Sequence, residues 1–479
     1  MSSDFDVIVI GAGPAGYVCA IRCAQLGLKT ACIDDWLDSS GQPVLGGTCL
    51  NAGCIPSKAL LENSEHYASL KGPDTHPGIS LQGLSLDLAA VQQDKQRIVT
   101  ELTNGIDTLF SSNGVERING RATLHPERHV HVSQHENNKV RVYTAEHVVI
   151  ATGSRPMDIP AARIDGHRIV DSTGALDFDD VPARLGIIGA GVIGLEMGSV
   201  WNRYGSEVTL LEAQDMFLPP VDRDIAAIAL AEFRKQGLDI RLEARVTETV
   251  NGDSGVCVTF SHTEEDHEME FDRLIVAVGR SPCSDEITSP EVELALEQGG
   301  SIHVDEHWET SVPGVYAIGD VIAGPMLAHK GSAEGPAVAE IIAGQHGEVN
   351  YASIPGVIYT EPELAWCGSS EQDLRNAGTP YRVGRFPFTA SGRARAMGKT
   401  AGLVKLLAHR DSDEILGVHI VGENASELIA EAVIAMEFKA SSEDLALTIH
   451  AHPTLSESLH EAALSVSGQA IHVANRRTD

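Results

Sequence analysis

The apolar positions of the chain open with a continuous run at residues 6–10, which predicts a strand buried on both faces of a parallel sheet. Apolar residues at helical spacing follow as far as Leu26, and Gly27 ends that pattern. A second apolar run at residues 30–33 then leads to Asp34. This order of strand, helix, strand and acidic residue is the one that a dinucleotide-binding fold requires.

The same pattern returns later in the chain, with apolar strands at residues 185–188 and 207–211 and Glu212 directly after the second. Each copy also closes on a further apolar strand, at residues 148–150 in the first copy and 274–278 in the second. Because whole units of the pattern repeat, we expect an internal duplication with two dinucleotide-binding domains.

The pattern changes after about residue 351. Short strand-like runs and one long helical pattern replace the repeating unit, as in an α+β domain with its own sheet. The strands are expected at residues 356–360, 403–408 and 415–421, and the helix at residues 426–439. The predicted fold is therefore α/β, with two Rossmann-like dinucleotide-binding domains and a C-terminal α+β domain.

Glycines at the spacing GxGxxG separate the first strand of each copy from its helix. They are Gly11, Gly13 and Gly16 in the first copy and Gly189, Gly191 and Gly194 in the second. Such glycines permit a tight turn and let a pyrophosphate approach the helix N-terminus, while the following acid accepts hydrogen bonds from ribose hydroxyls. Asp34 and Glu212 each lie 23 positions after the first glycine of their turn. A turn that only packs the helix does not account for two complete patterns.

The acid of the second copy indicates which dinucleotide binds there. Glu212 favours a free ribose 2′-hydroxyl because a carboxylate repels the 2′-phosphate of NADP, and no arginine follows before Arg223. The second copy is therefore expected to bind NAD. A nicotinamide does not readily exchange electrons with a disulfide, whereas a flavin does, so FAD is expected in the first copy.

The first copy contains two cysteines, Cys49 and Cys54, in a glycine-rich stretch at residues 46–58. Cysteines five positions apart cannot reach disulfide distance on an unbroken helix, so the spacing predicts a loop or a distorted first helical turn. A thiolate there would face unsatisfied helix N–H groups, which lower its pKa and make it reactive. The hypothesis is a redox-active disulfide. Two unrelated buried thiols, or half of a zinc site, are the alternatives.

A histidine and a carboxylate lie close together within residues 450–459. Glu457 is near enough in sequence to hold the imidazole of His452, and a histidine held by a carboxylate is the arrangement of a general base. Thr454 and Glu457 also fit a helix capping box, which is the structural alternative. Asp320, which follows another apolar strand, fits either sugar binding or helix capping.

Composition narrows the class of protein. The 479 residues are 43% apolar and 21% charged, as in a globular protein of several domains. The formal net charge of −32 and the lack of a basic run argue against a nucleic-acid partner. No apolar run reaches the length of a membrane-spanning helix. Eight scattered cysteines, and no presequence in residues 1–4, predict a reducing compartment, the cytoplasm.

Together these motifs resemble the class I pyridine nucleotide–disulfide oxidoreductases, and among them the enzymes that oxidise dihydrolipoamide. The resemblance covers nearly the whole chain and rests on residues 11–16, 46–58, 151–156, 189–196, 212, 319–320, 326–330 and 450–457. It implies four domains: an FAD-binding domain at residues 1–150, an NAD-binding domain at 151–279, a central domain at 280–350 that completes the FAD site, and an interface domain at 351–479 that forms a homodimer.

The resemblance also implies roles for individual residues. Cys54 would be the thiol against the flavin, and Cys49 the interchange thiol that meets substrate. His452, held by Glu457 and followed by a cis proline bond, would be the catalytic base for the partner subunit. The implied FAD contacts are Gly11, Gly13, Gly16, Asp34, Gly47, Thr48, Lys58, Thr152, Gly153, Asp320, Met326, Leu327, Ala328 and His329. The implied NAD contacts are Gly189, Gly191, Gly194, Glu196, Glu212 and Gly279, with Glu196 also expected to pair with Lys58 beside the flavin.

The implied activity is the oxidation of protein-bound dihydrolipoamide with reduction of NAD+, and with it a part in cellular redox balance. Its implied partners are the lipoyl domains and the peripheral-subunit-binding domain of a 2-oxo acid dehydrogenase complex. Two readings remain as alternatives: a disulfide reductase similar to glutathione reductase, and a non-catalytic flavoprotein subunit. The chain departs from the family pattern at Asp34, where glutamate is usual, and at Cys283, where asparagine is frequent.

Overall fold

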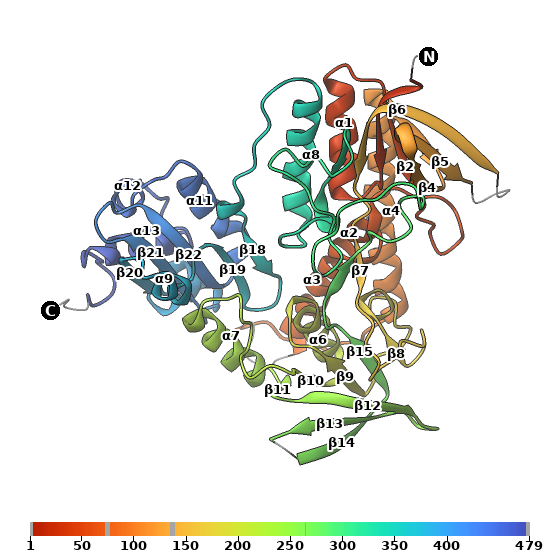
Figure 1. Cartoon of the computed structure of the whole chain (residues 1–479). Coiled ribbons are helices and arrows are strands. Elements are labelled where there is room, and N and C mark those ends of the chain that lie inside the picture. The colour runs from red at the N-terminus through yellow and green to blue at the C-terminus, as the bar shows by residue number, and fades with distance from the viewer. Residues whose placement is uncertain (1–2, 72–76, 135–138, 264, 476–479) are drawn as a thin grey trace.

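The computed structural model describes residues 3–71, 77–134, 139–263 and 265–475. Two expectations fall partly outside these ranges. The segment 1–4, in which no presequence is expected, includes Met1 and Ser2, and the predicted interface domain includes residues 476–479. Figure 1 shows two sheets with their helices stacked on one side of the molecule and a third sheet beside them.

The first sheet is built around a parallel core. Its strand order is β3-β2-β1-β6-β5-β4, and β17 pairs with β6. The strands are β1 (Phe5–Ile10), β2 (Thr30–Asp34), β3 (Glu116–Asn119), β4 (Arg121–His125), β5 (His129–Ser133), β6 (Val140–Ile150) and β17 (Val315–Ala317). Ile10 aligns with both Ile33 and Ile150, so the carboxyl ends of three parallel strands meet at one edge. Asp34 and the glycine turn after β1 lie at that edge.

Helices cover this sheet, as Figure 1 shows for α1 and α8, which pack against each other. They are α1 (Pro14–Gln25), α2 (Gly47–Ala52), α3 (Cys54–Lys71), α4 (Leu88–Asn113) and α8 (Ala328–Ile342). Because β17 and α8 come from the middle of the chain, the chain returns to the first sheet after it has formed the second. A short antiparallel pair, β7 (Ser154–Pro156) with β16 (Arg280–Pro282), joins the two units where the chain crosses between them.

The second sheet repeats the parallel arrangement with the order β11-β10-β9-β15-β8. Its strands are β8 (Ile169–Val170), β9 (Arg184–Ile188), β10 (Glu207–Leu211), β11 (Asp239–Arg241) and β15 (Arg273–Val276). The helices are α5 (Ser172–Ala175), α6 (Val192–Tyr204) and α7 (Arg223–Lys235). An antiparallel sheet of β12 (Arg245–Asn251), β13 (Val256–His262) and β14 (Glu265–Phe271) extends from it. The duplication of the strand–helix–strand unit is therefore present in the fold.

The third sheet is antiparallel, in the order β18-β19-β22-β21-β20. Its strands are β18 (Gly356–Ile358), β19 (Glu363–Gly368), β20 (Tyr381–Pro387), β21 (Leu403–His409) and β22 (Ile415–Gly422). The helices are α9 (Glu371–Ala377), α10 (Gly392–Met397), α11 (Ala425–Glu437), α12 (Ser442–Leu447) and α13 (Glu457–Val466). The strand expected at residues 356–360 ends at Ile358, because the chain leaves the sheet there to contact α3 and α6.

Candidate active site

The two cysteines of the glycine-rich stretch lie on two successive helices rather than one. Cys49 is in α2 and Cys54 is the first residue of α3, and Gly53 between them has φ −145° and ψ −111°, outside the helical region. The distortion predicted from their spacing is confirmed. A Cβ on Gly53 would lie 2.9 Å from the Thr48 carbonyl oxygen, so glycine is needed for the close approach of the two helices. Both cysteines carry free thiols in this structure.

The two thiols differ in acidity because they are hydrogen-bonded to each other. The hydrogen bond from the Cys49 thiol lowers the pKa of Cys54 to about 7. The Lys58 ammonium acts in the same direction, and burial acts in the opposite one. The same bond, together with burial, raises the pKa of Cys49. Near neutral pH the reduced pair therefore holds one proton on Cys49 and a thiolate at Cys54, and a thiolate is the reactive form of cysteine.

Lys58 and Glu196 form an ion pair beside the thiols. Lys58 follows Cys54 by about one helical turn in α3, and its Nζ donates to both carboxylate oxygens of Glu196 at 3.1 and 2.9 Å. Glu196 belongs to α6 of the second sheet, and its side chain is only 5% exposed. The expected pair is thus present, and it joins the two dinucleotide-type units next to the cysteines.

The glycine turns fit a bound pyrophosphate at their middle glycine. In the first turn, a Cβ on Gly11 or Gly16 would meet backbone oxygen at 2.3 or 1.8 Å, whereas a Cβ on Gly13 would meet nothing closer than 4.0 Å. In the second, Gly189 and Gly194 are equally crowded, and Gly191 has nothing within 4 Å. Within the described residues, no side chain caps the start of α1 or α6. Open space and uncapped helix N–H groups are what an anionic ligand requires.

The two acids at the strand ends take the same position in each copy. Asp34 accepts the N–H of Ala12 at 2.5 Å, and Glu212 accepts that of Ala190 at 2.9 Å, so each carboxylate lies against its glycine turn. Burial raises the pKa of Asp34 to about 6, although the N–H groups of Trp36 and Ala12 oppose this shift. A ribose hydroxyl beside such a carboxylate would find an acceptor in place.

Asp320 lies within a network that connects the two units. It follows β17 in a single 3₁₀ turn (Gly319–Val321), and its carboxylate accepts the Ser154 hydroxyl at 2.6 Å. Arg280 in turn donates to the Ser154 oxygen at 2.7 Å. Neither Ser154 nor Arg280 was singled out from the sequence. Both lie in the segments 151–156 and 280–282 that follow the matching strands, and this repeated position is the signal that could have identified them.

The remaining residues expected at the dinucleotides lie near these turns. A Cβ on Gly47 would be 2.7 Å from Gly13 Cα, which places Gly47 and Thr48 against the first turn. Thr152 and Gly153 are held by the main chain of Cys283, whose carbonyl accepts the Thr152 hydroxyl at 2.7 Å and whose N–H donates to Gly153 at 2.9 Å. Cys283 therefore contributes through its backbone.

The segment at residues 326–329 leads into α8. This helix begins at Ala328 after Leu327, and no described side chain caps it, so its first N–H groups are available to a ligand. His329 points elsewhere, with its Nε2 2.8 Å from the Pro355 carbonyl oxygen. Gly279, in the second unit, follows β15 with φ 128° and accepts the Met157 N–H at 3.0 Å.

His452 and Glu457 form the expected hydrogen bond. The His452–Pro453 peptide bond is cis, and His452 Nδ1 lies 2.9 Å from Glu457 Oε1. Burial by itself would raise the pKa of Glu457. Hydrogen bonds from the Thr454 N–H and His452 outweigh this effect and lower the pKa. The capping-box alternative is only partly correct, because α13 begins at Glu457 and its cap is Ser456. Thr454 nonetheless donates its N–H to the second Glu457 oxygen at 2.9 Å, so one carboxylate fills both roles.

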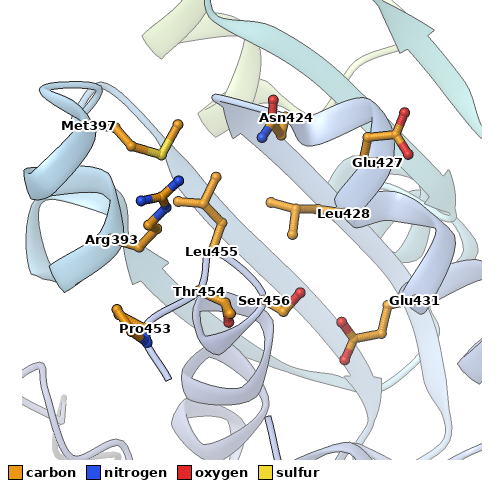
Figure 2. Close-up of a pocket in the computed structure, with 10 residues that line it drawn as sticks. All are labelled: Arg393, Met397, Asn424, Glu427, Leu428, Glu431, Pro453, Thr454, Leu455 and Ser456. Carbon is orange, nitrogen blue, oxygen red and sulfur yellow. The ribbon is translucent and has the colours of Figure 1, made fainter. Parts of the chain in front are cut away.

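The His452 side chain is 79% exposed, which leaves its Nε2 free to face another molecule. A cavity of about 480 Å³ opens on the same loop. Figure 2 shows residues 453–456 on one side of it and side chains of α10 and α11 on the others. Glu431 in its wall accepts a hydrogen bond from His450 at 2.5 Å, so the loop is held at His450 as well as at Glu457.

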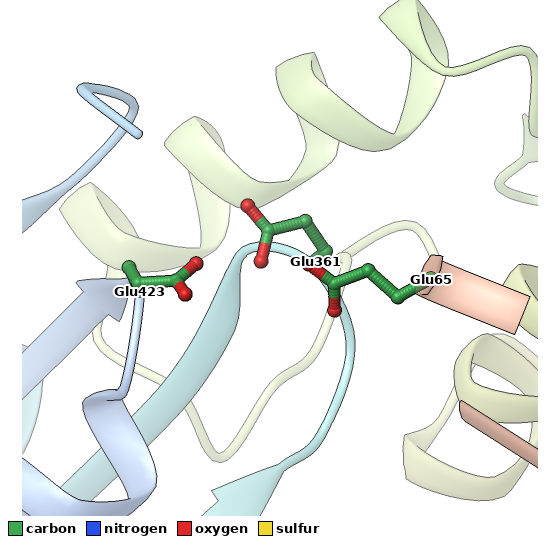
Figure 3. A group of neighbouring side chains, drawn as sticks. All are labelled: Glu65, Glu361 and Glu423. Carbon is green, nitrogen blue, oxygen red and sulfur yellow. The ribbon is translucent and has the colours of Figure 1, made fainter. Parts of the chain in front are cut away.

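Three carboxylates, Glu65, Glu361 and Glu423, approach one another where α3 meets the third sheet (Figure 3). They are the only group in the described part of the chain with the spacing of metal ligands. The Lys399 ammonium lies among them, 2.8 Å from Glu65, 3.0 Å from Glu361 and 3.7 Å from Glu423. The cluster is therefore an ion-pair network, and among the residues that the structure describes neither Cys49 nor Cys54 lies in a group with the spacing of metal ligands.

Three comparisons with known proteins bear on this site. Residues 5–335 match the family described as pyridine nucleotide-disulphide oxidoreductase, and residues 354–463 match the dimerisation domain of that family.

Among the described helices, none combines the length and apolar character needed to cross a membrane.

Individual relatives cover nearly the full chain. A dihydrolipoyl dehydrogenase of Cupriavidus necator is 48% identical across 99% of this chain and 100% of its own length. The mitochondrial dihydrolipoyl dehydrogenase 1 of Arabidopsis thaliana is 44% identical across 98% of this chain and 92% of its own length. Among solved structures, LpdA of Mycobacterium tuberculosis is similar with a TM-score of 0.87 at 26% identity, covering 95% of this chain and 98% of that one.

Proposed function

The chain belongs to the pyridine nucleotide–disulphide oxidoreductases, and from that premise we propose that it oxidises protein-bound dihydrolipoamide to lipoamide and reduces NAD+. It is an oxidoreductase whose cofactors are FAD and NAD. The observation that carries the proposal is the pair of Cys49 in α2 and Cys54 at the start of α3, in which one thiol ionises near neutral pH. A dithiol of this kind can be oxidised and reduced in every turnover.

In the first half-reaction the substrate reduces the Cys49–Cys54 disulfide. His452 of the partner subunit takes a proton from one dihydrolipoamide thiol, and the resulting thiolate attacks Cys49. The Cys49–Cys54 bond breaks, and Cys54 leaves as a thiolate that Lys58 stabilises. The second substrate thiol then attacks the mixed disulfide, which releases lipoamide and returns a proton to Cys49.

In the second half-reaction the dithiol is oxidised again. The Cys49–Cys54 bond re-forms, and two electrons and one proton leave as the hydride of NADH while a second proton is released. FAD, when bound, carries those electrons between the thiol pair and the nicotinamide. Lys58 on the cysteine helix and Glu196 on α6 join the two units beside the thiols.

We further propose a homodimer whose active sites each combine two subunits. His452 is held by Glu457 yet largely exposed, as expected for a base that serves another chain. Large apolar side chains are also exposed on α11 and near α12: Ile434 (59%), Phe438 (80%), Leu447 (76%) and Ile449 (96%). Large exposed apolar side chains are frequent at protein interfaces, and these four residues lie within the dimerisation-domain match.

The proposed partners are the lipoyl domains and the peripheral-subunit-binding domain of a 2-oxo acid dehydrogenase complex. A chain with a net charge of −32 would attract a basic binding domain over a distance of several ångströms. The proposed location is the cytoplasm, which suits a chain whose six cysteines besides Cys49 and Cys54 are free.

The decisive experiment compares two substrate pairs on the purified holoenzyme. Dihydrolipoamide with NAD+ is expected to give rapid appearance of NADH, and glutathione disulfide with NADPH is expected to give little reaction. The reverse result would move the chain to the glutathione-reductase-like alternative. Cys49→Ser is expected to abolish lipoamide turnover; if this variant still supports the biological role of the protein, the non-catalytic alternative holds instead.

A further inference from the structure

Tyr359 brings the third sheet into contact with the thiol site. It directly follows β18, and its ring lies against Lys58, with Nζ 4.5 Å from the ring centroid. Its backbone N–H donates to Glu196 Oε1 at 3.1 Å. One residue of the interface region therefore contacts both members of the ion pair, each of which comes from a different dinucleotide-type unit.

The ring restricts a side chain that would otherwise have several options. Lys58 has four rotatable side-chain bonds, is 32% exposed, and can also donate to the Ser57 hydroxyl at 3.3 Å. An ammonium against an aromatic face is attracted by the ring quadrupole, most strongly where water is excluded. Tyr359 is itself 38% exposed, so its ring contacts the ammonium at the edge of the buried site. Without it, Lys58 could turn toward water and away from the cysteines.

The position of the ion pair matters because its two charges act on Cys54 in opposite directions. Lys58 lowers the pKa of Cys54, and Glu196 raises it. The Tyr359 N–H donates a hydrogen bond to one oxygen of Glu196, which opposes the effect of that carboxylate on Cys54. The Tyr359 ring holds the Lys58 ammonium, so both contacts favour the Cys54 thiolate. Cys54 is also acted on by the Cys49 thiol, by burial and by its own backbone N–H, and the Tyr359 phenol lies within electrostatic range of it.

Tyr359 is itself held against the cysteine helix by the ion-pair cluster of Figure 3. Glu361, two residues further on, shares the Lys399 ammonium with Glu65, which lies about two turns after Lys58 on α3. The Gln236 amide also donates to the Glu361 carbonyl at 2.6 Å. The segment 359–361 is thus linked to α3 through the shared Lys399 ammonium and to the end of α7 through Gln236, which restricts movement of the ring away from Lys58.

We propose that Tyr359 is a positioning residue of the thiol pair, which keeps the Lys58 ammonium where it stabilises the Cys54 thiolate. The inference rests on the proposed function, since it concerns the same site. The contacts to Lys58 and Glu196 use the ring and the backbone, and burial raises the pKa of the Tyr359 phenol, so the phenol is uncharged at the pH where Cys54 titrates.

The test is the pH at which the Cys54 thiolate forms in holoenzyme that carries Cys49→Ser, where only one thiol of the pair remains. The readout is the long-wavelength absorbance of the thiolate against the flavin, followed as a function of pH. Tyr359→Leu is expected to raise the midpoint by about 0.5 to 1 pH unit. Tyr359→Phe keeps the ring and is expected to leave the midpoint where it is.

Equal midpoints in the leucine, phenylalanine and parent proteins would overturn the proposal, and so would an equal shift in both variants. If Tyr359→Leu does not fold, Tyr359→Met provides a longer and more flexible ringless side chain, with the same expected shift. The alkylation rate of Cys54 by iodoacetamide against pH gives a second measure of the midpoint. Failure of the proposed function would show differently, as absent lipoamide turnover in the unsubstituted enzyme.

Discussion

At the scale of single residues, the site depends on side chains whose acidity is set by a few neighbours. Cys54 ionises near pH 7 because Cys49 donates to it and Lys58 lies close by. Glu457 is shared between His452 and the Thr454 N–H, one carboxylate oxygen for each. Asp34 shows the opposite effect, since burial raises its pKa and the carboxyl group stays protonated to a higher pH than usual.

The raised pKa of Asp34 predicts a pH-dependent affinity for FAD. A ribose hydroxyl that donates to Asp34 favours the ionised carboxylate, so binding below pH 6 must first remove a proton. The affinity of the apoprotein for FAD is expected to be about tenfold weaker at pH 5 than at pH 7. Fluorescence quenching of FAD titrated with apoprotein at the two pH values measures it.

Asp34→Asn is the matched control, because its amide oxygen can still accept a hydrogen bond but does not titrate. A tenfold difference that persists in this variant would assign the effect to another group.

In the apoprotein itself, the same raised pKa means that the stabilising contribution of Asp34 is present below about pH 4 and is lost as the pH rises through about 6. The folded chain then holds a proton that the unfolded chain has already released.

At the scale of elements, each glycine turn divides its glycines between packing and ligand. The first and third glycines touch backbone atoms of the same unit, so they are required by the fold. The middle glycine faces open space in both copies. The two copies can therefore be separated experimentally by changing the second turn alone.

Gly191→Ala and Gly194→Ala are expected to fail in different ways. The first adds a methyl group where the NAD pyrophosphate is expected, and should raise the KM for NADH by roughly 10- to 100-fold while the melting temperature and FAD content stay unchanged. The second places a Cβ 2.1 Å from the Gly189 oxygen and should destabilise the fold by about 1–3 kcal/mol. NADH oxidation with an artificial acceptor and thermal unfolding measure both. A similar loss of stability in both variants would contradict the assignment.

At the scale of the whole molecule, the residues of the proposed chemistry come from different parts of the chain. The cysteines belong to the first unit, Glu196 to the second, and Tyr359 and His452 to the region of the third sheet. His452 faces outward, so the chemistry is expected to be complete only when two chains associate.

Hybrid dimers test this expectation directly. Cys49→Ser and His452→Gln homodimers should each lack lipoamide turnover, because every site is missing one group. After subunit exchange, half of the dimers are hybrids with one intact site, so the mixture should regain about a quarter of the parent activity. Lipoamide turnover before and after exchange measures the gain. If the mixture stays inactive although native mass spectrometry detects hybrids, His452 acts within its own chain.

The motifs that the sequence reveals share one property. The local structure of each is determined by residues that are close together in the chain. A glycine turn, two cysteines around a helix break and a His-Pro bond followed by a carboxylate are each made within fewer than fifteen residues. Buried parallel strands likewise show as unbroken apolar runs, because both their faces are covered. The duplication, the cysteine distortion and the bond from His452 to Glu457 could therefore be inferred in advance.

Tyr359 and the cluster around Lys399 could not be found in that way. Lys58 and Glu196 are 138 positions apart, and Glu65 and Lys399 are 334 apart, so only the packing of one unit on another brings them together. Tyr359 looked like the end of a strand because its apolar neighbours carry that pattern. Its contact with Lys58, and the acidity of Cys54 that follows from such contacts, arise from long-range packing and burial, which have no local sequence signal.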